Sequence, residues 1–541
     1  MSSSSCVGSD GCVGSDADGA DSGMGWFPRR FSLDVLRRRS AVPAGFVGSC
    51  NYSQPTSAST VQIMTRSPVS RNPEAAGADA ADPAGAELVA TLTARLGAVG
   101  VRTDPDVMAT YSRDRLPLAP AGTPLAVVFP SSTEQVQDVV RACADAGVPI
   151  VPRGAGSGLC GGANALDGCV VLVLTRMNRI VELDPANRLA VVEPGVVNAD
   201  LRAAVAEHDL FYPPDPASYD FCTIGGNLAT NAGGLCCVKY GVTSDSVLGL
   251  EVVLADGSVL HTGRRTVKGV AGYDLTKLFV GSEGTLGVIT RATLSLRPLP
   301  QAPGTLVAVF PDTADAGAAV TRIVGEGLVP SLMEIMDAAT VHAVEQHLGT
   351  DLGGGTGGGT LLLCQSDAGG EAAERELDVL QRVCADSGAS LVHATSDPGE
   401  GALLMQARRS VHPAIESMGR DLTDDVCVPR TRIAELIDGC ARISADVGLR
   451  IVVNGHAGDG NMHPTVIYNH DDEFDRARSA FDAICELALG MGGTVSGEHG
   501  IGKFKQDWLA RELGPVGLRV HRDIRRSLDP DGLFNPGSMF T

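Results

Sequence analysis

The chain has 541 residues, with 43 Lys plus Arg and 64 Asp plus Glu, which gives a formal net charge of −21 at pH 7. This balance argues against nucleic acid as a partner, because a surface that follows phosphate groups needs a basic patch. The hydrophobic fraction of 44% is that of an ordinary globular protein, and no apolar run approaches the ~18 residues of a membrane span.

Residues 1–83 are rich in Ser, Gly, Ala and Asp and have no sustained helical or strand period, which predicts a disordered extension. Arginines between Met24 and Ser40 suggest a transit peptide, but acidic residues precede them. A mitochondrial location therefore stays open. A translation start near Met64 is the simpler interpretation.

Residues 84–299 are predicted to form the first folded domain. A helical period over 86–96 is followed by a strand, a helix and a second strand within 124–154, which ends in a glycine loop. Ser131 and Glu134 have the spacing of a capping box at the start of that helix. Its apolar stripe consists of Val136, Val139, Val140 and Cys143. Further strands are expected at 170–174, 180–183, 189–192, 247–254 and 286–296.

Residues 300–541 are predicted to form the second domain. Two strand–helix–strand units are expected at 305–336 and 360–394. The glycine tract at 353–359 between them predicts a flexible loop and not a phosphate cradle, because it contains no Lys. A helix near 430–447, a hairpin near 451–468 and closing helices complete the chain.

The 14 cysteines are scattered and form no Cys-x-x-Cys pair. This argues against zinc-finger and iron–sulfur binding by this chain alone. Unclustered thiols in a chain of this length predict reduced core residues in a cytosolic compartment. We therefore expect a cytoplasmic protein without a transmembrane segment, and peripheral contact with the inner membrane stays open.

The glycine loop after the second strand contains Gly156-x-Gly158-x-x-Gly161, which formally matches a dinucleotide-binding fingerprint. A Rossmann unit needs a helix directly after that loop, but the next strand begins near Cys169. The loop is therefore expected to hold an anionic group with its own backbone N–H groups. A short glycine run is by itself more often a turn. Further loops at 213–216, 224–234 and 281–289 predict one backbone-lined groove for a long ligand.

A second group of residues carries histidines and a carboxylate. Asp459-Gly460 is a strong turn signal, so the flanking strands should bring His456 and His463 together. Residues 496–502 add Glu498 and His499 on a glycine-rich loop. Two imidazoles and one carboxylate leave coordination positions open, which is typical of a catalytic metal site. Zinc, manganese and iron all suit these ligands.

Taken together and in this order, these motifs resemble the FAD-linked D-2-hydroxyacid dehydrogenases and oxidases, which include D-lactate dehydrogenases and the glycolate oxidase catalytic subunit. The resemblance runs from about Pro117 to the C-terminus. It implies an α+β fold with a two-part FAD-binding domain of the vanillyl-alcohol oxidase (PCMH) type. A ferredoxin-like α/β cap domain for the substrate and C-terminal helices would follow.

The resemblance also implies the cofactor site. Residues 154–158 would hold the FAD pyrophosphate. Some relatives bond the flavin covalently through a His in this loop, and because Ser157 stands there in this sequence, we expect non-covalent FAD. The implied cofactor-binding residues are Arg153, Gly154, Ala155, Gly156, Ser157, Gly158, Gly161, Gly162, Pro214, Gly225, Gly226, Asn227, Thr230, Glu283, Gly287, Ile289 and Asn535.

The resemblance implies that His456, His463 and Glu498 bind a divalent metal and that His499 is the catalytic base. A neutral imidazole suits removal of a hydroxyl proton near neutral pH.

A substrate carboxylate favours a bidentate cation, and the family motif prefers Arg408 over Arg409 for that role. A solvated charge on a helix is an equal alternative for either arginine. His412, four residues after Arg408, is expected to share its helix face and to contact substrate.

The expected activity is oxidation of a small D-2-hydroxyacid, D-lactate or glycolate, to the 2-oxoacid. Residues 423–429 look more like D-lactate dehydrogenases than like relatives that act on dicarboxylates, where a Lys is found near Thr423. The electron acceptor stays open among a quinone, a cytochrome, an electron-transfer flavoprotein and oxygen. A homodimer and a partner subunit are both open.

Two alternatives compete with this activity. One is a flavin-independent enzyme in which His456, His463 and Glu498 bind Fe(II) for oxygen chemistry. The other keeps the fold but not the reaction, as a flavin-binding transferase that resembles alkyl-glycerone-phosphate synthase or as a flavin-binding subunit that is inert alone.

Overall fold

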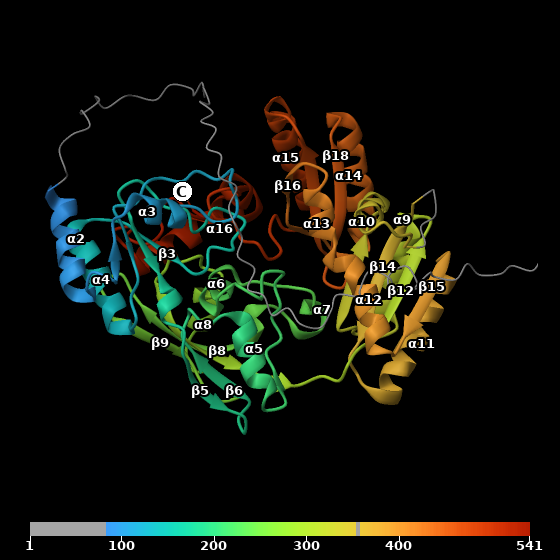
Figure 1. Cartoon of the computed structure of the whole chain (residues 1–541), viewed down its shortest axis with the longest axis horizontal. Helices are drawn as coiled ribbons and strands as arrows, with labels where there is room; N and C mark the ends of the chain where they lie inside the picture. The colour runs from blue at the N-terminus through green and yellow to red at the C-terminus, as the bar shows by residue number, and fades with distance from the viewer. Residues whose placement is uncertain (1–82, 353–357, 541) are drawn as a thin grey trace, which may run out of the picture.

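The structure is a computed structural model that describes residues 83–352 and 358–540. Residues 1–82 of the predicted extension and residues 353–357 of the glycine tract lie outside this range. Figure 1 shows a part in blue and green beside a part in yellow and orange. The closing helix α16 (Gln506–Leu528) lies on the blue and green side, so the end of the chain returns to its first half.

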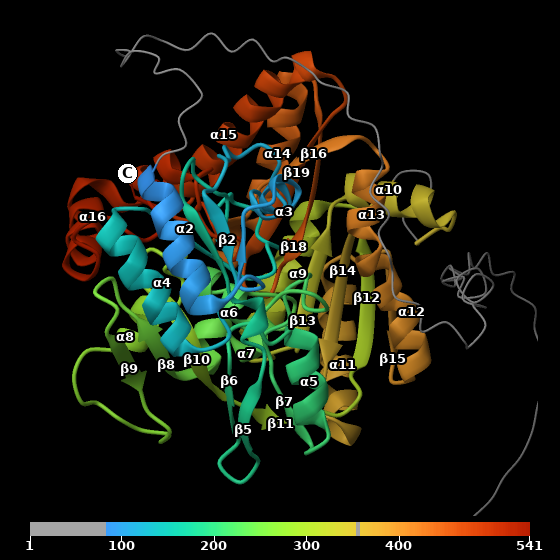
Figure 2. The ribbon, with the colours of Figure 1, turned by 60° about the vertical axis from the view of Figure 1, so that its left-hand side comes forward.

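The first sheet has the strand order β1-β2-β4-β3, with β2, β4 and β3 parallel. Helices α2 and α4 pack side by side against it (Figure 2). No helix lies between β3 and β4, which agrees with the exclusion of a Rossmann unit. The elements are α2 (Pro83–Leu96), β1 (Val101–Arg102), α3 (Pro105–Tyr111), β2 (Ala126–Val128), α4 (Thr133–Ala146), β3 (Ile150–Arg153) and β4 (Val170–Val173).

The apolar stripe predicted for α4 is buried, but its N-terminal cap is one residue later than expected. The hydroxyl of Ser132, and not that of Ser131, accepts the N–H of Gln135 at 3.3 Å. Ser131 instead bonds the side chain of Gln135 through its N–H, at 2.8 Å. The helix begins at Thr133, so Ser132 is its N-cap, and the side chain of Gln135 accepts the N–H of the residue before the cap instead of the N–H of the cap itself.

The second sheet is antiparallel with the order β5-β6-β10-β8-β9. Strands β5, β6, β8 and β10 lie at the predicted places, whereas β9 was not predicted. Its buried residues form one core with α5 and α6. The elements are β5 (Ile180–Asp184), β6 (Leu189–Val192), α5 (Asn198–Ala206), β7 (Leu210–Phe211), α6 (Ile224–Thr230), α7 (Cys237–Tyr240), β8 (Val247–Val253), β9 (Val259–Gly263), α8 (Leu275–Phe279), β10 (Val288–Ser295) and β11 (Arg297–Pro298).

The third sheet has the order β15-β12-β14-β13-β18-β19-β16, with β17 paired to β19. Its first four strands carry the antiparallel order and intervening helices of a ferredoxin-like unit, as expected. The elements are β12 (Gly304–Phe310), α9 (Thr313–Gly325), β13 (Leu332–Met336), α10 (Ala338–Leu348), β14 (Thr360–Ser366), α11 (Gly370–Asp386) and β15 (Leu391–Thr395).

Strand alternation gives this sheet two buried faces. One face packs under α9, α11, α14 and α15, and the other under α10, α12 and α13. The remaining elements are α12 (Pro398–Arg409), α13 (Val411–Glu416), β16 (Arg420–Thr423), β17 (Val426–Cys427), α14 (Ile433–Val447), β18 (Arg450–His456), β19 (Asn461–Tyr468) and α15 (Phe474–Gly490).

Two contacts tie the end of the chain to its first half. The segment 533–535 runs along the edge of β3, where the N–H of Ile150 donates to Leu533 and the N–H of Asn535 donates to Ile150, each at 2.8 Å. The buried carboxylate of Glu283 accepts the N–H groups of Ile501 and Gly502, each at 2.7 Å. The loop that carries Glu498 and His499 is therefore held against the glycine loop of the first half.

Every cysteine within the described residues is free, and most are buried, as expected for reduced core thiols. Over residues 83–352 and 358–540, no helix is long and apolar enough to cross a membrane.

Candidate active site

The hairpin of β18 and β19 brings two histidines together. The chain reverses at the predicted Asp459-Gly460 turn, where Gly460 has a φ of +88° that favours glycine. Asn454 pairs with His463 in the ladder, so His456, two residues after Asn454, lies diagonally across the same face. The Nε2 atoms of His456 and His463 are 3.4 Å apart.

Glu498 completes a triangle with these two histidines. Its Oε1 lies 3.4 Å from each Nε2 atom, and all three donors come from buried or partly buried side chains. Tetrahedral ligands at about 2.1 Å from a zinc-sized ion stand about 3.4 Å apart. The triangle thus has the dimensions of one face of such a site, with the fourth position left open. These residues fit a divalent cation.

The charges of the triangle depend on Glu334, which contacts His456 on the side away from the other two ligands. Burial would lower the pKa of His456, but the carboxylates of Glu334 and Glu498 raise it well above the usual value. Burial would raise the pKa of Glu498, but the two histidines lower it well below the usual range. Glu334 accepts from Nδ1 of His456 at 2.6 Å, which leaves Nε2 directed at the triangle.

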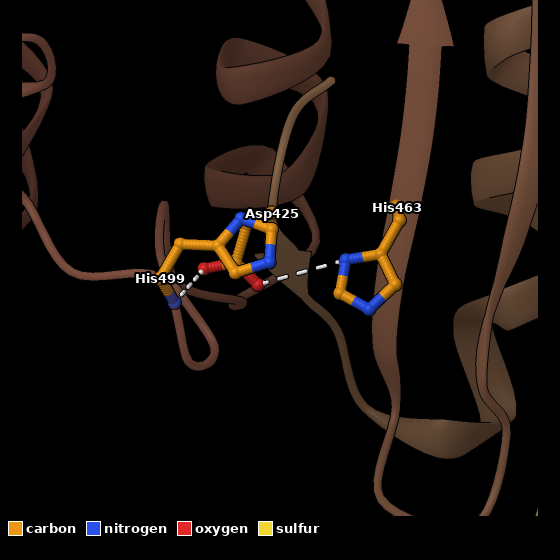
Figure 3. A group of neighbouring side chains, drawn as sticks. All are labelled: Asp425, His463 and His499. Carbon is orange, nitrogen blue, oxygen red and sulfur yellow. Dashed lines mark hydrogen bonds and ion pairs between the residues drawn. The ribbon is translucent and has the colours of Figure 1, made fainter. Parts of the chain in front are cut away.

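His499 lies beside the triangle, with its ring stacked on that of His463 at 5.2 Å between centroids. Figure 3 shows both rings around Asp425, which accepts the backbone N–H of His499 at 2.7 Å. Burial lowers the pKa of His499 from its ordinary value. The imidazole is therefore neutral near pH 7, and one ring nitrogen has a lone pair that can accept a proton.

Asp425 holds the loop that carries Glu498 and His499. Besides His499, its carboxylate accepts the Ser496 hydroxyl at 2.8 Å, the Glu498 N–H at 3.0 Å and the Asn461 amide at 2.8 Å. Burial would raise its pKa, but the neighbouring His499, Lys505 and His463 hold it well below the usual range. Asp425, His463 and His499 are also close enough to hold a cation. That group fits one less well, because the oxygens of Asp425 already accept four donors.

The next buried carboxylate, Asp424, has a different partner. It pairs with the Nζ of Lys505 at 2.7 Å and accepts from the thiol of Cys485 at 3.2 Å. Within the part of the chain that the structure describes, Asp424 makes none of the hydrogen bonds to residues 496–499 that Asp425 makes.

Arg408 and His412 are separated by the structure. Arg408 lies in the last turn of α12 with its Nε 2.6 Å from Glu334, and it is mostly buried. Helix α12 ends at Arg409 and α13 begins at Val411, so the helix face expected to join Arg408 and His412 is not formed. His412 is exposed and pairs with Glu416 at 3.0 Å. The expectation that it accompanies Arg408 is wrong for this reason, and Arg409 is exposed as well.

The glycine loop fits a ligand that lies directly on the backbone. Gly156 has a φ of +77°, and a Cβ there would collide with the guanidinium of Arg153. A Cβ on Gly154 would lie 2.5 Å from the hydroxyl of Thr223. Within the described residues, the N–H groups of Ala155, Gly156 and Ser157 donate to no protein group. The buried Nε of Arg153 also has no partner there. These unpaired donors suit the phosphates of a dinucleotide.

The other implied cofactor residues fall into three groups. Gly162 lies beside Glu283 and accepts the side-chain amide N–H of Asn535 at 2.8 Å, while Gly161 lies beside Ala119 and Lys503. The implied residues around α6 are fixed by contacts within the protein. The side-chain amide of Asn198 donates to Asn227 and to the carbonyl of Pro214. The N–H of Gly226 donates to the hydroxyl of Thr223, the hydroxyl of Thr230 donates to the carbonyl of Gly226, and a Cβ on Gly225 would collide with Pro194. Ile289 is buried in strand β10 of the second sheet, Gly287 is buried just before that strand, and the carbonyl of Gly158 accepts the N–H of Arg115.

The glycine loop and the histidine cluster are neighbours. The N–H of Lys503, four residues after His499, donates to Cys160 at 3.0 Å. A Cβ on Gly233, in the loop after α6, would lie 2.7 Å from Oε2 of Glu498. Both glycine-rich loops of the first half therefore border the cluster of the second half.

Glu334 and Asp425 are site residues that the sequence reasoning missed. Glu334 is the one charged residue in the otherwise apolar strand β13, and such a position favours a paired, functional carboxylate. That signal was present in the sequence. Asp425 lies within residues 423–429, which indicated only a substrate preference. No sequence pattern in that segment points to the contacts of Asp425.

Comparisons with known proteins agree with this arrangement. A family model described as FAD linked oxidases, C-terminal domain, matches residues 299–539, and one described as FAD binding domain matches residues 124–263. The glycolate oxidase subunit GlcD of Bacillus subtilis (strain 168) is 40% identical over 80% of this chain and 92% of its own length. The D-lactate dehydrogenase of Anaerostipes hadrus is 36% identical over 79% of this chain and 92% of its own length.

Among solved structures, p-cresol methylhydroxylase with substrate bound aligns with a TM-score of 0.73 at 21% identity, over 85% of this chain and 97% of that chain. This likeness shows the vanillyl-alcohol oxidase type of fold. The match to an FAD-binding domain leaves the flavin-independent alternative without support. The chain belongs to the family of FAD-linked oxidases, flavin-dependent oxidoreductases that include glycolate oxidase subunits and D-lactate dehydrogenases.

Proposed function

We propose that the chain oxidises a small D-2-hydroxyacid, D-lactate or glycolate, to the 2-oxoacid. FAD, bound non-covalently on the glycine loop, would accept the hydride from the α-carbon. His456, His463 and Glu498 would hold a divalent cation that lowers the pKa of the substrate hydroxyl and orients it. In this proposal residues 84–299 form the FAD-binding domain and residues 300–541 the domain with the substrate and metal residues.

His499 is the proposed base. Its pKa is lowered by burial, so the ring is neutral at the pH where it must accept the hydroxyl proton. The stacking on His463 orients its ring, and the hydrogen bond from its backbone N–H to Asp425 fixes its place in the loop. A positioned base of this kind contributes about 10²- to 10⁴-fold to the rate.

Arg408 is the proposed partner of the substrate carboxylate. Its Nε is taken by Glu334, while neither terminal nitrogen of its guanidinium makes a hydrogen bond within the described residues. Both are therefore available for a bidentate contact to a carboxylate. One arginine binds one carboxylate, so this arrangement suits a substrate with a single carboxylate.

One observation carries this proposal above the others: the triangle of His456, His463 and Glu498, with His499 stacked beside it, lies where the chain contacts the glycine loop. A base and a cation site next to a flavin cradle suit removal of a proton and a hydride from one carbon.

The test is anaerobic mixing of the purified flavoprotein with a panel of D- and L-2-hydroxyacids while the flavin spectrum is followed. D-lactate or glycolate should bleach the oxidised flavin, and L-lactate should not. Failure of every hydroxyacid to bleach it would contradict the proposal and favour the transferase alternative.

The electrons would leave the flavin to an external acceptor. The cysteines of the described residues are dispersed and offer no cluster that could carry electrons onward. Reoxidation of the reduced protein by a quinone, a cytochrome, an electron-transfer flavoprotein or oxygen, compared under equal conditions, identifies that acceptor by the highest rate.

A further inference from the structure

Glu334 holds two groups of the site with its two carboxylate oxygens. Oε1 lies 2.6 Å from Nδ1 of His456, and Oε2 lies 2.6 Å from Nε of Arg408. The side chain is fully buried, and no other residue in the described part of the chain touches both partners through hydrogen bonds. One carboxylate therefore links a residue of the metal triangle to the arginine of α12.

The sheet places Glu334 for this task. Strands β13 and β18 are hydrogen-bonded neighbours, with Glu334 directly opposite His456 in the ladder. Arg408 comes from α12, which packs on the same face of the sheet as Leu332 and Met336, the neighbours of Glu334 at alternate positions on β13. The backbone thus presents both partners to one side chain, and neither contact depends on a mobile loop.

The charges make the arrangement specific for a carboxylate. The two oxygens of Glu334 face an imidazole nitrogen and a guanidinium nitrogen, and each oxygen accepts one hydrogen bond. Both contacts are short and charge-assisted, and hydrogen bonds of this class are about twice as strong as neutral ones. A neutral amide could accept from one partner only, because its nitrogen is a donor.

We propose that Glu334 is a positioning residue that sets the place of the substrate-binding arginine relative to the metal triangle. This inference rests on the proposed function and deepens it. A 2-hydroxyacid carries its hydroxyl and carboxylate on adjacent carbons, so the cation and the guanidinium must stand at one matching separation. Glu334 fixes that separation through its contacts to His456 and Arg408 and does not itself contact the substrate.

The test compares Glu334→Gln with Asp337→Asn in the flavin-loaded protein. Asp337 is the control: it is a partly buried carboxylate three residues along the chain, and it accepts the N–H of Thr340 at 2.7 Å as the N-cap of α10. Two quantities are measured for each protein. One is the dissociation constant for Zn²⁺ or Mn²⁺ after removal of bound metal, and the other is KM and kcat for D-lactate.

Glu334→Gln is expected to weaken metal binding by about 10- to 100-fold, the usual effect of removing the partner of a ligating histidine. KM for D-lactate should rise by at least about tenfold, more than kcat falls, while the flavin spectrum stays unchanged. Combined with Arg408→Lys, its effect on KM should be less than the product of the single effects. Asp337→Asn should lower the melting temperature and change neither constant.

If Glu334→Gln does not fold, Glu334→Asp is used, because it keeps the charge but withdraws the carboxylate by one bond from both partners. The same paired loss is expected, at smaller size. A folded, flavin-loaded variant with unchanged metal affinity and unchanged KM would overturn the inference. If instead the wild-type protein binds no divalent metal and is not reduced by D-lactate, the proposed function itself fails, and the two failures are distinguishable.

Discussion

The backbone N–H of His499 donates to the carboxylate of Asp425 at 2.7 Å, across 74 residues of sequence. The same carboxylate also accepts the backbone N–H of Glu498 and the hydroxyl of Ser496. A buried anion at the centre of these donors determines the shape of the loop. The proposed base and one proposed metal ligand thus share a single anchor.

Replacement of Asp425 by Asn should therefore reduce activity through loop geometry. Asn keeps the shape but turns one acceptor into a donor, which leaves a loop N–H or hydroxyl unsatisfied at a cost of about 1–3 kcal/mol. Flavin reduction by D-lactate should slow by about 10- to 100-fold with the flavin still bound. Asp424→Asn is the control, because Asp424 is equally buried but pairs with Lys505. It should cost stability and leave the reduction rate within about twofold of wild type. Equal rate losses in both variants would argue against the anchor.

His499→Ala should separate chemistry from cofactor binding. The flavin should remain bound, while its reduction by D-lactate slows by about 10²- to 10⁴-fold because no group accepts the hydroxyl proton. His412→Ala serves as the matched control, since its imidazole is exposed and paired with Glu416. Stopped-flow absorbance measures both. A reduction rate in His499→Ala equal to that of His412→Ala would contradict the assignment of the base.

Gly156→Ala should weaken FAD binding specifically. Ala is strained at the φ of +77°, and its Cβ would also displace the guanidinium of Arg153 in the cradle. Gly168→Ala is the control, because its φ of +72° imposes the same strain of about 1–2 kcal/mol while the space around it is open. In the absence of FAD, the melting temperatures of both variants should be lowered by similar amounts. Only Gly156→Ala should lose FAD affinity, by about tenfold or more in a fluorescence titration. Equal affinities would show that the loop does not carry the cofactor.

Glu283 should make stability depend on pH. Burial raises its pKa from 4.5 to about 7, although the N–H groups of Ile501 and Gly502 oppose this. The native state then binds more protons than the unfolded state between these values, so stability falls as pH rises through that window. The full effect is on the order of 3 kcal/mol.

Glu283→Gln removes that dependence, because the amide does not titrate. Relative to the variant, the wild-type melting temperature should fall between about pH 5 and pH 7.5. Other buried carboxylates are common to both proteins and cancel in the difference. Parallel curves for the two proteins across this range would show that Glu283 does not titrate there.

The sequence allowed the fold and half of the site to be predicted, because those parts depend on local patterns. The turn at Asp459-Gly460 and the alternation of the flanking strands were enough to bring His456 and His463 onto one face. The absence of room for a helix after Gly161 excluded a Rossmann unit correctly. The ferredoxin-like order and the FAD cradle came from resemblance, not from periodicity.

The remaining contacts join residues far apart in the chain, which local patterns cannot reveal. Glu334 and His456 are 122 positions apart, and Glu283 and Ile501 are 218 apart. The error at His412 has a different cause. A spacing of four predicts a shared face only within one helix, and the backbone at Ser410 ends α12 and starts α13.

The central claim is that the flavin cradle and the histidine–carboxylate triangle act as one active site. The most direct measurement is the rate of flavin reduction by D-lactate, under anaerobic conditions, in the flavin-loaded protein stripped of divalent metal and again after metal is restored. We expect the stripped protein to be reduced at least about 100-fold more slowly, with recovery on addition of Zn²⁺ or Mn²⁺. A rate that is the same with and without metal, in a protein that binds the ion, would contradict the account.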